Sequence, residues 1–234
     1  MYVEDKLSHN WLIKKAINNL VRDRASSLSG KVLDLGCGTR PFEADILKYA
    51  DEYIGVDWSN TLHGLRADVA ADLNEPLPIR NDSIDHVVSF EVMEHLREPG
   101  VMLSEAFRVL KNGGSITLST PFQWWVHEAP WDYYRYTCFG HQYLFGKVGF
   151  VDVLVKPTTG FWSMWLLKFN YQLMRLARGP RWKRRLILAI LIPIWWIDQQ
   201  LGRAIDHVWH EERETAGYFV TARKPRTPTE QELR

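Results

Sequence analysis

The sequence K-V-L-D-L-G-C-G-T-R-P, residues 31–41, decides the fold of this chain. Three apolar residues within 31–35 predict a short buried strand, and Gly36 and Gly38 then predict a sharp turn. Pro41 favours the first position of a helix, where a missing N–H group costs nothing. A strand, a glycine turn and a helix in this order seat a nucleotide-like ligand in open α/β sheets, because the ligand approaches bare backbone and faces the N–H groups of the helix.

Asp57 strengthens this interpretation. It ends a second apolar strand about 20 residues after the turn, which is the spacing at which an acidic residue binds the hydroxyls of a ribose. A dinucleotide fingerprint, G-x-G-x-x-G, requires glycine where this chain has Pro41. The turn therefore predicts a ribose-containing ligand, whose identity depends on residues further along the chain.

Apolar runs and turn residues predict alternating strands and helices along the chain. We expect strands at 31–35, 52–57, 67–71, 85–90, 115–120, 151–156 and 218–224, and helices at 9–28, 41–50, 99–110 and 140–150. Such alternation predicts a doubly wound α/β fold with a mostly parallel sheet, which binds ligands at the carboxyl ends of its strands. The residues at or just beyond those ends are Asp34, Gly36, Asp57, Asp72, Glu91 and Pro121.

The composition describes one folded domain of 234 residues, with or without an insertion. An apolar share of 46% supplies a core, and a net charge of +1 gives no reason to expect a nucleic-acid partner. The two cysteines predict no disulfide framework and favour a reducing compartment. Because the N-terminus also lacks an apolar signal-peptide core, we expect a cytoplasmic protein.

Five spaced motifs resemble those of class I S-adenosylmethionine-dependent methyltransferases of the type-11-like kind. They are V-L-D-L-G-C-G at 32–38, Asp57, P-L-P-I with N-D-S-I-D at 76–85, E-V-M-E-H-L at 91–96, and R-V-L-K-N-G-G at 108–114. The resemblance implies a seven-stranded, Rossmann-like sheet whose last strand is antiparallel, and S-adenosyl-L-methionine as the cofactor. Arg40 replaces the third glycine of the family's G-x-G-x-G turn, and we expect its side chain to narrow the pocket.

The resemblance also implies a set of cofactor-binding residues, which are Asp34, Gly36, Cys37, Gly38, Asp57, Trp58, Asp72, Leu73, Glu91 and His95. Asp34 and the glycine backbone would hold the methionine part, and Asp57 would hold the ribose. Asp72 and Leu73 would meet the edge of the adenine.

Residues 120–137 form an aromatic segment directly after the fifth strand. Seven of its 18 residues are Phe, Trp or Tyr, interleaved with His127, Glu128, Asp132 and Arg135. Aromatic surface with a few convergent polar groups is what a pocket for an organic acceptor requires. The segment resembles the corresponding part of methyltransferases encoded among bacterial surface-polysaccharide and glycolipid genes, which implies a glycan or lipid-linked acceptor.

Methyl transfer to a hydroxyl needs a group that accepts the hydroxyl proton, since the cofactor itself is already activated. We expect His127 to be this base, because an imidazole titrates near neutrality and the segment leaves the sheet directly over the cofactor. Glu128 or Asp132 would orient it or act in its place, unless they serve only in ion pairs. Glu91 and His95 are explained equally well by fixing their loop and by contacting the acceptor.

His207 and His210 form the one sequence pattern that resembles part of a metal site. Side chains three residues apart share a helix face. No further cluster of ligands accompanies them in the sequence, so we expect a solvated helix end and no metal site.

A long insertion separates the sixth and seventh predicted strands. Residues 153–197 contain no Asp or Glu and eight Lys or Arg, and five of the eleven tryptophans lie between 162 and 196. Residues 161–177 have the pattern of an amphipathic helix, and twelve apolar residues, 186–197, follow a basic cluster. At about 1.5 Å per residue, such an apolar run is too short to cross a bilayer core of about 30 Å.

We therefore expect residues 157–205 to form a basic, Trp-rich helical hairpin that lies on an anionic membrane surface, or caps the active site, or does both. Alternatively, the hairpin forms a homodimer interface, which would bury its apolar helices without a membrane. The methyltransferase domain would comprise residues 1–156 and 206–224, and residues 225–234 would be a disordered tail.

Together these patterns predict an S-adenosylmethionine-dependent O-methyltransferase for a glycan or lipid-linked acceptor, at the inner face of the plasma membrane. One alternative is a methyltransferase for a small molecule, either a quinone or a secondary metabolite, with the hairpin as a lid. The other is a binding module that keeps the cofactor pocket and has lost the chemistry, for which Arg40 is the only support in the sequence.

Overall fold

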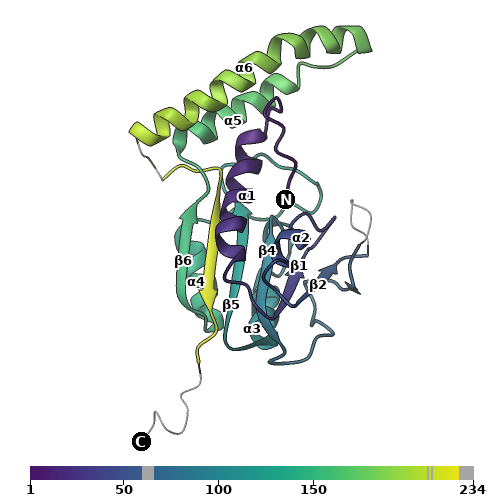
Figure 1. The fold of residues 1–234 in the computed structure, drawn as a ribbon, viewed down its shortest axis with the longest axis vertical. Coiled ribbons are helices and arrows are strands. Elements are labelled where there is room, and N and C mark those ends of the chain that lie inside the picture. The colour runs from purple at the N-terminus through teal and green to yellow at the C-terminus, as the bar shows by residue number, and fades with distance from the viewer. Residues whose placement is uncertain (60–65, 210, 212, 227–234) are drawn as a thin grey trace, which may run out of the picture.

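The computed structural model describes residues 1–59, 66–209, 211 and 213–226. Its centre is a seven-stranded sheet in the order β3-β2-β1-β4-β5-β7-β6, with helices on both faces (Figure 1). β1 pairs with β2 on one side and with β4 on the other, so the order of the strands reverses at β1. A reversal of strand order of this kind is where open α/β sheets bind their ligands.

The strands are β1 (Lys31–Leu35), β2 (Glu52–Asp57), β3 (Val69–Ala70), β4 (Ile84–Phe90), β5 (Leu110–Pro121), β6 (Val151–Pro157) and β7 (Gly217–Arg223). β1 to β5 pair in parallel, and β7 is antiparallel to both β5 and β6. The predicted seven-stranded, mostly parallel sheet with an antiparallel last strand is therefore confirmed. The third strand is shorter than the predicted 67–71, because only two of its residues pair with β2.

The helices are α1 (Trp11–Ala25), α2 (Glu43–Ile46), α3 (Pro99–Val109), α4 (Cys138–Val148), α5 (Phe161–Met174) and α6 (Arg181–Val208), with a 3₁₀ helix at Met93–His95. Successive residues of a strand point to opposite faces of its sheet. Val32 of β1 accordingly packs in an apolar cluster with residues of α1 and α2, and Leu33 in a larger cluster with residues of α3 and α4. Both faces of the sheet are thus covered, which explains why its parallel strands are almost continuously apolar.

One helix is much shorter than predicted. We predicted residues 41–50, whereas α2 covers only Glu43–Ile46, so Pro41 precedes the helix instead of opening it. The cause lies in the preceding turn. Arg40 has a left-handed backbone, with φ 58°, and its N–H donates to the carbonyl of Cys37, so the chain is still turning when it reaches the proline.

The helices α5 and α6 form a hairpin between β6 and β7, beyond the carboxyl ends of the parallel strands (Figure 1). The buried Asp198 accepts a hydrogen bond from Nδ2 of Asn170 at 3.0 Å, which ties the two helices together. Gly202 lets them approach closely, since a Cβ at this position would lie 3.1 Å from Cδ1 of Leu166. The helical residues span 161–208, close to the predicted 157–205.

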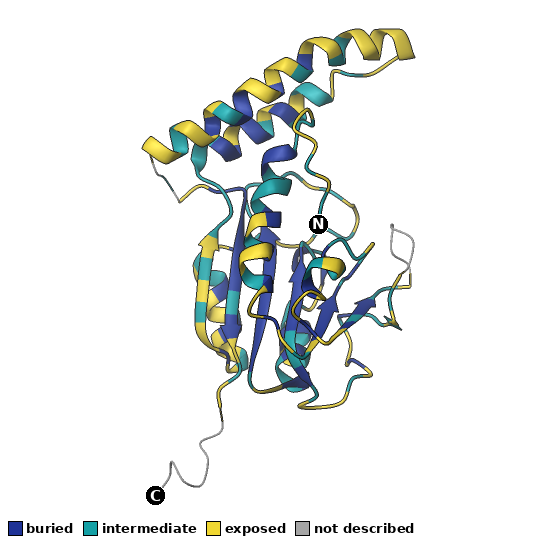
Figure 2. Ribbon diagram, viewed as in Figure 1, coloured by how far each residue is buried: buried dark blue, intermediate teal, exposed yellow. Residues whose placement is uncertain are grey.

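The hairpin is attached to the rest of the molecule through α1. The side-chain oxygen of Gln199 accepts a hydrogen bond from the N–H of Leu12 at 2.9 Å. Met164 and Leu167 of α5 pack with Ala216 and the partly buried Ile13. By contrast, the start of α6 and its outward side are exposed (Figure 2).

None of the helices in the described part of the chain combines the length and the apolarity needed to cross a bilayer. The beginning of the predicted tail, residues 225–226, follows β7 as irregular chain. Residues 227–234 of that tail, and His210 of the histidine pair, lie outside the described residues.

Candidate cofactor and acceptor site

The glycine turn after β1 has the geometry that its sequence predicted. Gly36 has φ 80°, and a Cβ there would lie 2.4 Å from Cγ2 of Val92, so only glycine fits. Its N–H donates to the carbonyl of Val56 at 2.8 Å. Gly38, with φ 51°, donates its N–H to Oδ2 of Asp57 at 2.7 Å. The turn is therefore bonded to the end of β2, and its open side is bare backbone.

Arg40 does not narrow the pocket, contrary to our expectation. Its guanidinium pairs with Asp68 and with Glu43, and lies 5.5 Å from the ring centre of Tyr53. The side chain lines neither of the two cavities described below. Because Arg40 adopts the left-handed conformation that a glycine would take, the turn keeps its path while the guanidinium lies against Gly55 of β2.

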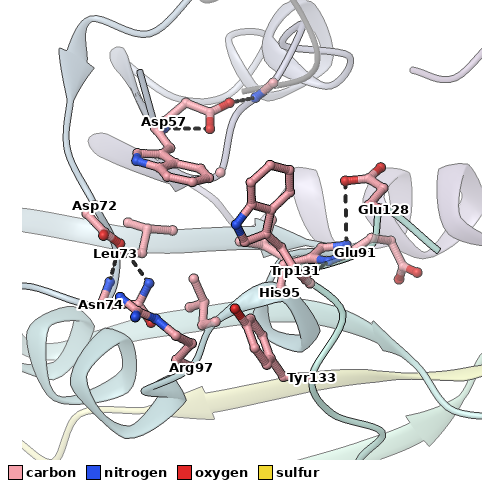
Figure 3. A pocket seen from close by; sticks show the side chains of 15 residues that line it. Asp57, Asp72, Leu73, Asn74, Glu91, His95, Arg97, Glu128, Trp131 and Tyr133 are labelled. Carbon is pink, nitrogen blue, oxygen red and sulfur yellow. Dashed lines mark hydrogen bonds and ion pairs between the residues drawn. The ribbon is translucent and has the colours of Figure 1, made fainter. Parts of the chain in front are cut away.

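A cavity of about 430 Å³ opens at the carboxyl ends of β1, β2 and β4 (Figure 3). Eight of the predicted cofactor residues line it, namely Gly36, Gly38, Asp57, Trp58, Asp72, Leu73, Glu91 and His95. These residues are spread over some sixty positions of the chain, and the reversal of strand order brings them together. Cavities of about 300–1,000 Å³ are typical of small-molecule and cofactor sites.

Asp57 and Asp72 are both fixed by hydrogen bonds at the cavity wall (Figure 3). The two carboxylate oxygens of Asp57 each accept one main-chain N–H, from Gly38 and from Trp58, both at 2.7 Å. A carboxylate offers about four acceptor positions, so Asp57 keeps capacity for two hydroxyl groups. Asp72 accepts from the main-chain and side-chain nitrogens of Asn74, at 2.9 and 2.7 Å.

A second cavity, of about 260 Å³, adjoins the first and shares Gly36, Gly38, Glu91 and Glu128 with it. The remaining predicted cofactor residues, Asp34 and Cys37, line this one. Asp34 is 2% exposed and accepts a hydrogen bond from the Tyr53 hydroxyl. Burial raises the pKa of Asp34 to about 7, against the lowering effect of that hydrogen bond. Tyr2, whose ring packs edge-to-face on Phe42, also lines this cavity.

Glu91 ends β4 in a strained conformation. Its φ is 55°, in the left-handed region that few residues other than glycine adopt. Its Oε1 accepts a hydrogen bond from the hydroxyl of Ser119 on the neighbouring β5, at 2.6 Å. Burial raises the pKa of Glu91. Strain of this kind is held by surrounding structure and is concentrated at functional sites.

The three predicted catalytic residues lie together on the loop after β5, in different environments. Glu128 lines both cavities, and its Oε2 is 3.9 Å from Nε2 of His95 (Figure 3). The ring of His127 lies behind this pair, 4.9 Å from the ring of His95. Asp132 is almost fully buried and bonded to Arg135 at 2.6 and 2.8 Å.

Asp132 holds His127 in place. Its Oδ2 accepts the main-chain N–H of His127 at 2.8 Å and lies 3.3 Å from the ring nitrogen Nδ1. Burial raises the pKa of Asp132, but the hydrogen bonds from Arg135 and from the main-chain N–H of His127, together with the charge of Arg135, outweigh it, and the result is a pKa of about 2. Asp132 is therefore ionised and positions the imidazole. Burial, with His95 nearby, lowers the pKa of His127.

Several residues of the site were not predicted. The cavity wall also contains Asn74, Val92, Leu96, Arg97, Trp131 and Tyr133. Trp131 packs edge-to-face on Trp58, with ring centres 5.6 Å apart, and so covers one end of the cavity. The aromatic content of residues 120–137 indicated such a wall, but no spacing in the sequence identified the ring that faces it.

The family comparison agrees with this geometry. Residues 11–154, more than half of the chain, match the family described as methyltransferase domain. The match covers the glycine turn, Asp57 and the whole aromatic segment.

Two similar proteins illustrate the range of relatives. Over 97 residues the chain is 38% identical to a protein of Mycolicibacterium smegmatis named as a probable S-adenosylmethionine-dependent methyltransferase, covering 38% of this chain and 37% of that protein. Over 189 residues it is 24% identical to the ubiquinone biosynthesis O-methyltransferase of Pseudomonas fluorescens, covering 68% of this chain and 78% of that enzyme. The chain thus spans well under half the length of the first of these relatives.

Solved structures share the fold at low identity. The [4+2]-cyclase SpnF has a TM-score of 0.59 at 19% identity, over 90% of this chain and 81% of that one. An S-adenosylmethionine-dependent methyltransferase from Archaeoglobus fulgidus has a TM-score of 0.56 at 16% identity, over 93% and 95%. These likenesses concern the fold alone. Together with the family match and the motifs, they lead to one conclusion: the chain belongs to the methyltransferase domain family of S-adenosylmethionine-dependent enzymes.

Proposed function

We propose that this protein transfers a methyl group from S-adenosylmethionine to a hydroxyl oxygen of a glycan or lipid-linked acceptor at an anionic membrane surface. The observation that carries the cofactor assignment is the carboxylate of Asp57, fixed at the cavity wall by two N–H groups and still able to accept two hydroxyls.

The chain's own residues fit the cofactor in two adjoining cavities. Asp57 would accept the ribose hydroxyls in the larger cavity, and Asp72 with Leu73 would border the adenine. Asp34 would face the ammonium group of the methionine part in the smaller cavity. S-adenosylmethionine supplies an activated methyl group when bound, so the chain has to align the acceptor, exclude water and remove a proton.

Aromatic rings and polar groups surround the space left for an acceptor. Trp131 and Tyr133 line the cavity on the side of the loop after β5, and Glu128 lies where the two cavities meet. Flat apolar rings suit the faces of sugars and prenyl chains, while the carboxylate of Glu128 suits a hydroxyl. We therefore assign acceptor binding to this loop, with Glu128 at the cavity wall and His127 behind it as the candidate groups for removing the hydroxyl proton.

The membrane assignment is supported by an exposed apolar stripe on α6. Its members recur at intervals of three, four or seven residues, and are Leu186, Ile190, Ile194, Ile197, Leu201 and Val208. At 3.6 residues per turn they share one face of the helix, over about 33 Å. Leu191 and Trp195 face the opposite way and are buried. The stripe is thus a second apolar face that has no partner in the described part of the chain.

The charge pattern indicates what would cover this stripe. The exposed residues Arg181, Lys183, Arg184 and Arg185 begin α6, and residues 153–197 contain no Asp or Glu. An apolar face flanked by basic residues suits the interface of an anionic bilayer, where each Lys or Arg near the surface contributes about 1 kcal/mol. The stripe lies on the hairpin beyond the carboxyl ends of the strands, which is the end of the sheet that holds the cavities (Figure 1).

A small-molecule acceptor is the second candidate. Ubiquinone biosynthesis O-methyltransferases of Pseudomonas fluorescens and Hahella chejuensis are among the similar proteins, at 24% and 29% identity. Incubation with methyl-labelled S-adenosylmethionine and either lipid-linked glycans or prenylated phenols separates the two. If only the phenols become labelled, the acceptor is a small molecule and not a glycan.

Calorimetry tests the cofactor assignment. We expect binding of S-adenosylmethionine and of S-adenosylhomocysteine, and a loss of about 1.5–3 kcal/mol in Asp57→Ala, since a charged hydrogen-bond acceptor is removed. Asp82→Ala is the matched control, because Asp82 is exposed and pairs with Lys224 away from the cavities. If neither ligand binds the native protein, the methyltransferase assignment and the binding-module alternative both fail.

Flotation on vesicles tests the membrane assignment. We expect the protein to float with vesicles that contain anionic lipid, and the triple variant Ile190→Gln, Ile197→Gln, Leu201→Gln to remain in solution. The control replaces the exposed Phe139 and Leu154, which lie outside the hairpin, with Gln. Equal flotation of stripe and control variants would remove the membrane from the proposal.

A further inference from the structure

Three side chains from two segments converge beside the larger cavity: Glu94 and His95 from the 3₁₀ helix after β4, and His127 from the loop after β5. Each offers one ligand atom, and these atoms lie within 4.8 Å of one another. We propose that this cluster binds a divalent metal ion at the wall of the acceptor cavity. The sequence had led us to expect no metal site.

The carboxylate of Glu94 is the first argument. The residue is 0% exposed, and neither of its side-chain oxygens accepts a hydrogen bond from the described part of the chain. A buried carboxylate without partners is costly, and buried charged groups are normally paired or bound to a metal. Since Oε1 lies 3.6 Å from Nε2 of His95, the unpartnered carboxylate is directed at the cluster. A cation between these atoms would satisfy it.

The tautomer and the orientation of the His95 ring suit a metal ligand. Its Nδ1 lies 2.6 Å from the carbonyl oxygen of Trp131, and because a carbonyl only accepts, Nδ1 must donate. In the neutral ring the lone pair is then on Nε2, the atom that faces Glu94. Metal-binding histidines almost always donate their other N–H to a carbonyl or carboxylate, because this fixes the tautomer and the ring orientation.

His127 is held by its neighbours on the same loop. Its Nδ1 lies 3.3 Å from Oδ2 of Asp132 and accepts a hydrogen bond from Nη2 of Arg135 at 3.5 Å, since a guanidinium can only donate. Binding a cation through Nε2 requires the ring proton to move to Nδ1, where the carboxylate of Asp132 is near enough to accept it. Arg135 in turn fixes Asp132 by two hydrogen bonds, so the whole group is rigid before any ion binds.

The ligand set indicates the class of ion. Two imidazole nitrogens and one carboxylate favour a first-row transition ion, from Mn²⁺ to Zn²⁺, over Mg²⁺ or Ca²⁺, which prefer oxygen ligands. Three protein ligands leave coordination positions for water or substrate. Because His95 lines the cavity, those positions are within reach of an acceptor oxygen (Figure 3).

The role of the ion rests on the proposed methyl transfer, whereas its binding does not. A hydroxyl bound to a divalent cation loses its proton more readily. That proton would pass to Glu128, whose Oε2 lies 3.9 Å from Nε2 of His95, the oxygen would form a bond to the methyl carbon, and the bond from carbon to sulfur would break. The sulfonium thereby becomes a neutral thioether, and His127 acts as a ligand and not as the base.

Manganese binding to the metal-free, full-length protein tests the site. We expect one Mn²⁺ per chain by electron paramagnetic resonance and calorimetry, and binding at least ~100-fold weaker in Glu94→Gln, His95→Asn and His127→Asn. The control is His207→Asn, which removes an exposed imidazole at the end of α6. An unchanged circular-dichroism spectrum and an unchanged midpoint of thermal unfolding show that each variant is folded.

Three outcomes would overturn the inference: no binding of Mn²⁺ or Zn²⁺, unchanged binding in all three cluster variants, or loss of binding in the control alone. Each leaves the proposed function standing if S-adenosylmethionine still binds. Conversely, cluster-dependent Mn²⁺ binding in a protein that does not bind S-adenosylmethionine would support the site while removing the methyl transfer.

Discussion

Asp34 and His127 are the two side chains whose protonation bears most directly on function. Asp34 is buried beneath the glycine turn, where solvent cannot stabilise its charge, and its pKa is raised to about 7. His127 is held by the ionised Asp132, and its pKa is lowered, chiefly by burial. Asp34 is therefore an acid that loses its proton only near neutrality, whereas His127 is an imidazole that stays neutral there.

Cofactor binding is expected to depend on pH through Asp34. An ammonium group pairs with the ionised carboxylate, so affinity for S-adenosylmethionine should rise as the pH approaches about 7 from below, by up to about tenfold per pH unit, and level off above it. Calorimetry at several pH values measures this. Asp34→Asn should remove the dependence, and adenosine, which lacks the ammonium group, should not show it. A pH-independent affinity in the native protein would contradict the assignment.

The raised pKa of Asp34 also makes the free energy of unfolding depend on pH. The folded pKa of Asp34, about 7, lies above the ordinary value of 3.8. Its contribution to stability is therefore complete below about pH 4 and is lost as the pH rises through about 7. In urea unfolding, Asp34→Asn should flatten the dependence of the unfolding free energy on pH over this window. An unchanged slope would show that Asp34 is ionised in the folded protein.

Replacing His127 separates binding from chemistry. We expect His127→Ala to bind S-adenosylmethionine about as tightly as the native protein, because His127 lines neither cavity. Its turnover should fall by a factor on the order of 10² to 10⁴, whether the imidazole removes the proton or holds the cation that promotes its loss. Single-turnover assays with methyl-labelled cofactor measure this. Full activity would exclude both roles.

At the scale of elements, the glycine turn and the 3₁₀ helix after β4 are built against each other. A Cβ on Gly36 would lie 2.4 Å from Cγ2 of Val92, the residue that precedes this helix. The 3₁₀ helix carries Glu94 and His95, so the position of the turn and that of the proposed metal cluster are linked through a few residues.

Substitution of Gly36 tests this contact. We expect Gly36→Ala to lower the unfolding free energy by about 1–3 kcal/mol for the positive φ alone, with a further loss from the clash at Val92. Adding Val92→Ala should recover the second part only. Gly146→Ala is the control, because this glycine lies within α4 with open space around it and should gain up to about 1 kcal/mol. Equal effects at the two glycines would show that the turn is not strained.

At the scale of the whole molecule, the hairpin and the sheet differ in how they are stabilised. The sheet has apolar clusters on both faces. The hairpin is packed on one side only, and residues 181–186 at the start of α6 are all exposed. A helix without packing is marginal in water, since most helical stability in proteins comes from tertiary contacts.

Hydrogen exchange should reveal this difference. We expect the amides of residues 185–190 to exchange much faster than those of residues 195–202, where the buried Trp195, Gln199 and Gly202 pack on the rest of the molecule. Vesicles with anionic lipid should slow exchange in the first group only. Uniform protection along α6 without vesicles would indicate that another partner, such as a second copy of the chain, covers the stripe.

Much of the fold could be predicted because its signals are local. The bounds of β1 and β2 match the predicted ranges, since a buried parallel strand is a short apolar run ended by a turn. The length of α2 could not be predicted, because the left-handed Arg40 delays the helix and no local pattern marks that conformation. The juxtaposition of Glu94 and His95 with His127 could not be predicted for a related reason, since some thirty residues separate them in the chain.

The sequence by itself determined the order of strands and helices, the glycine turn, the acid at the end of β2 and the basic, Trp-rich hairpin, because each depends on residues that are close together in the chain. Only the tertiary structure decided that Arg40 turns away from the pocket, that Asp132 fixes His127, and that Glu94 is buried without a hydrogen-bond partner. These features arise where segments distant in sequence meet, and the charge or proton that a side chain carries there is set by what the fold places beside it.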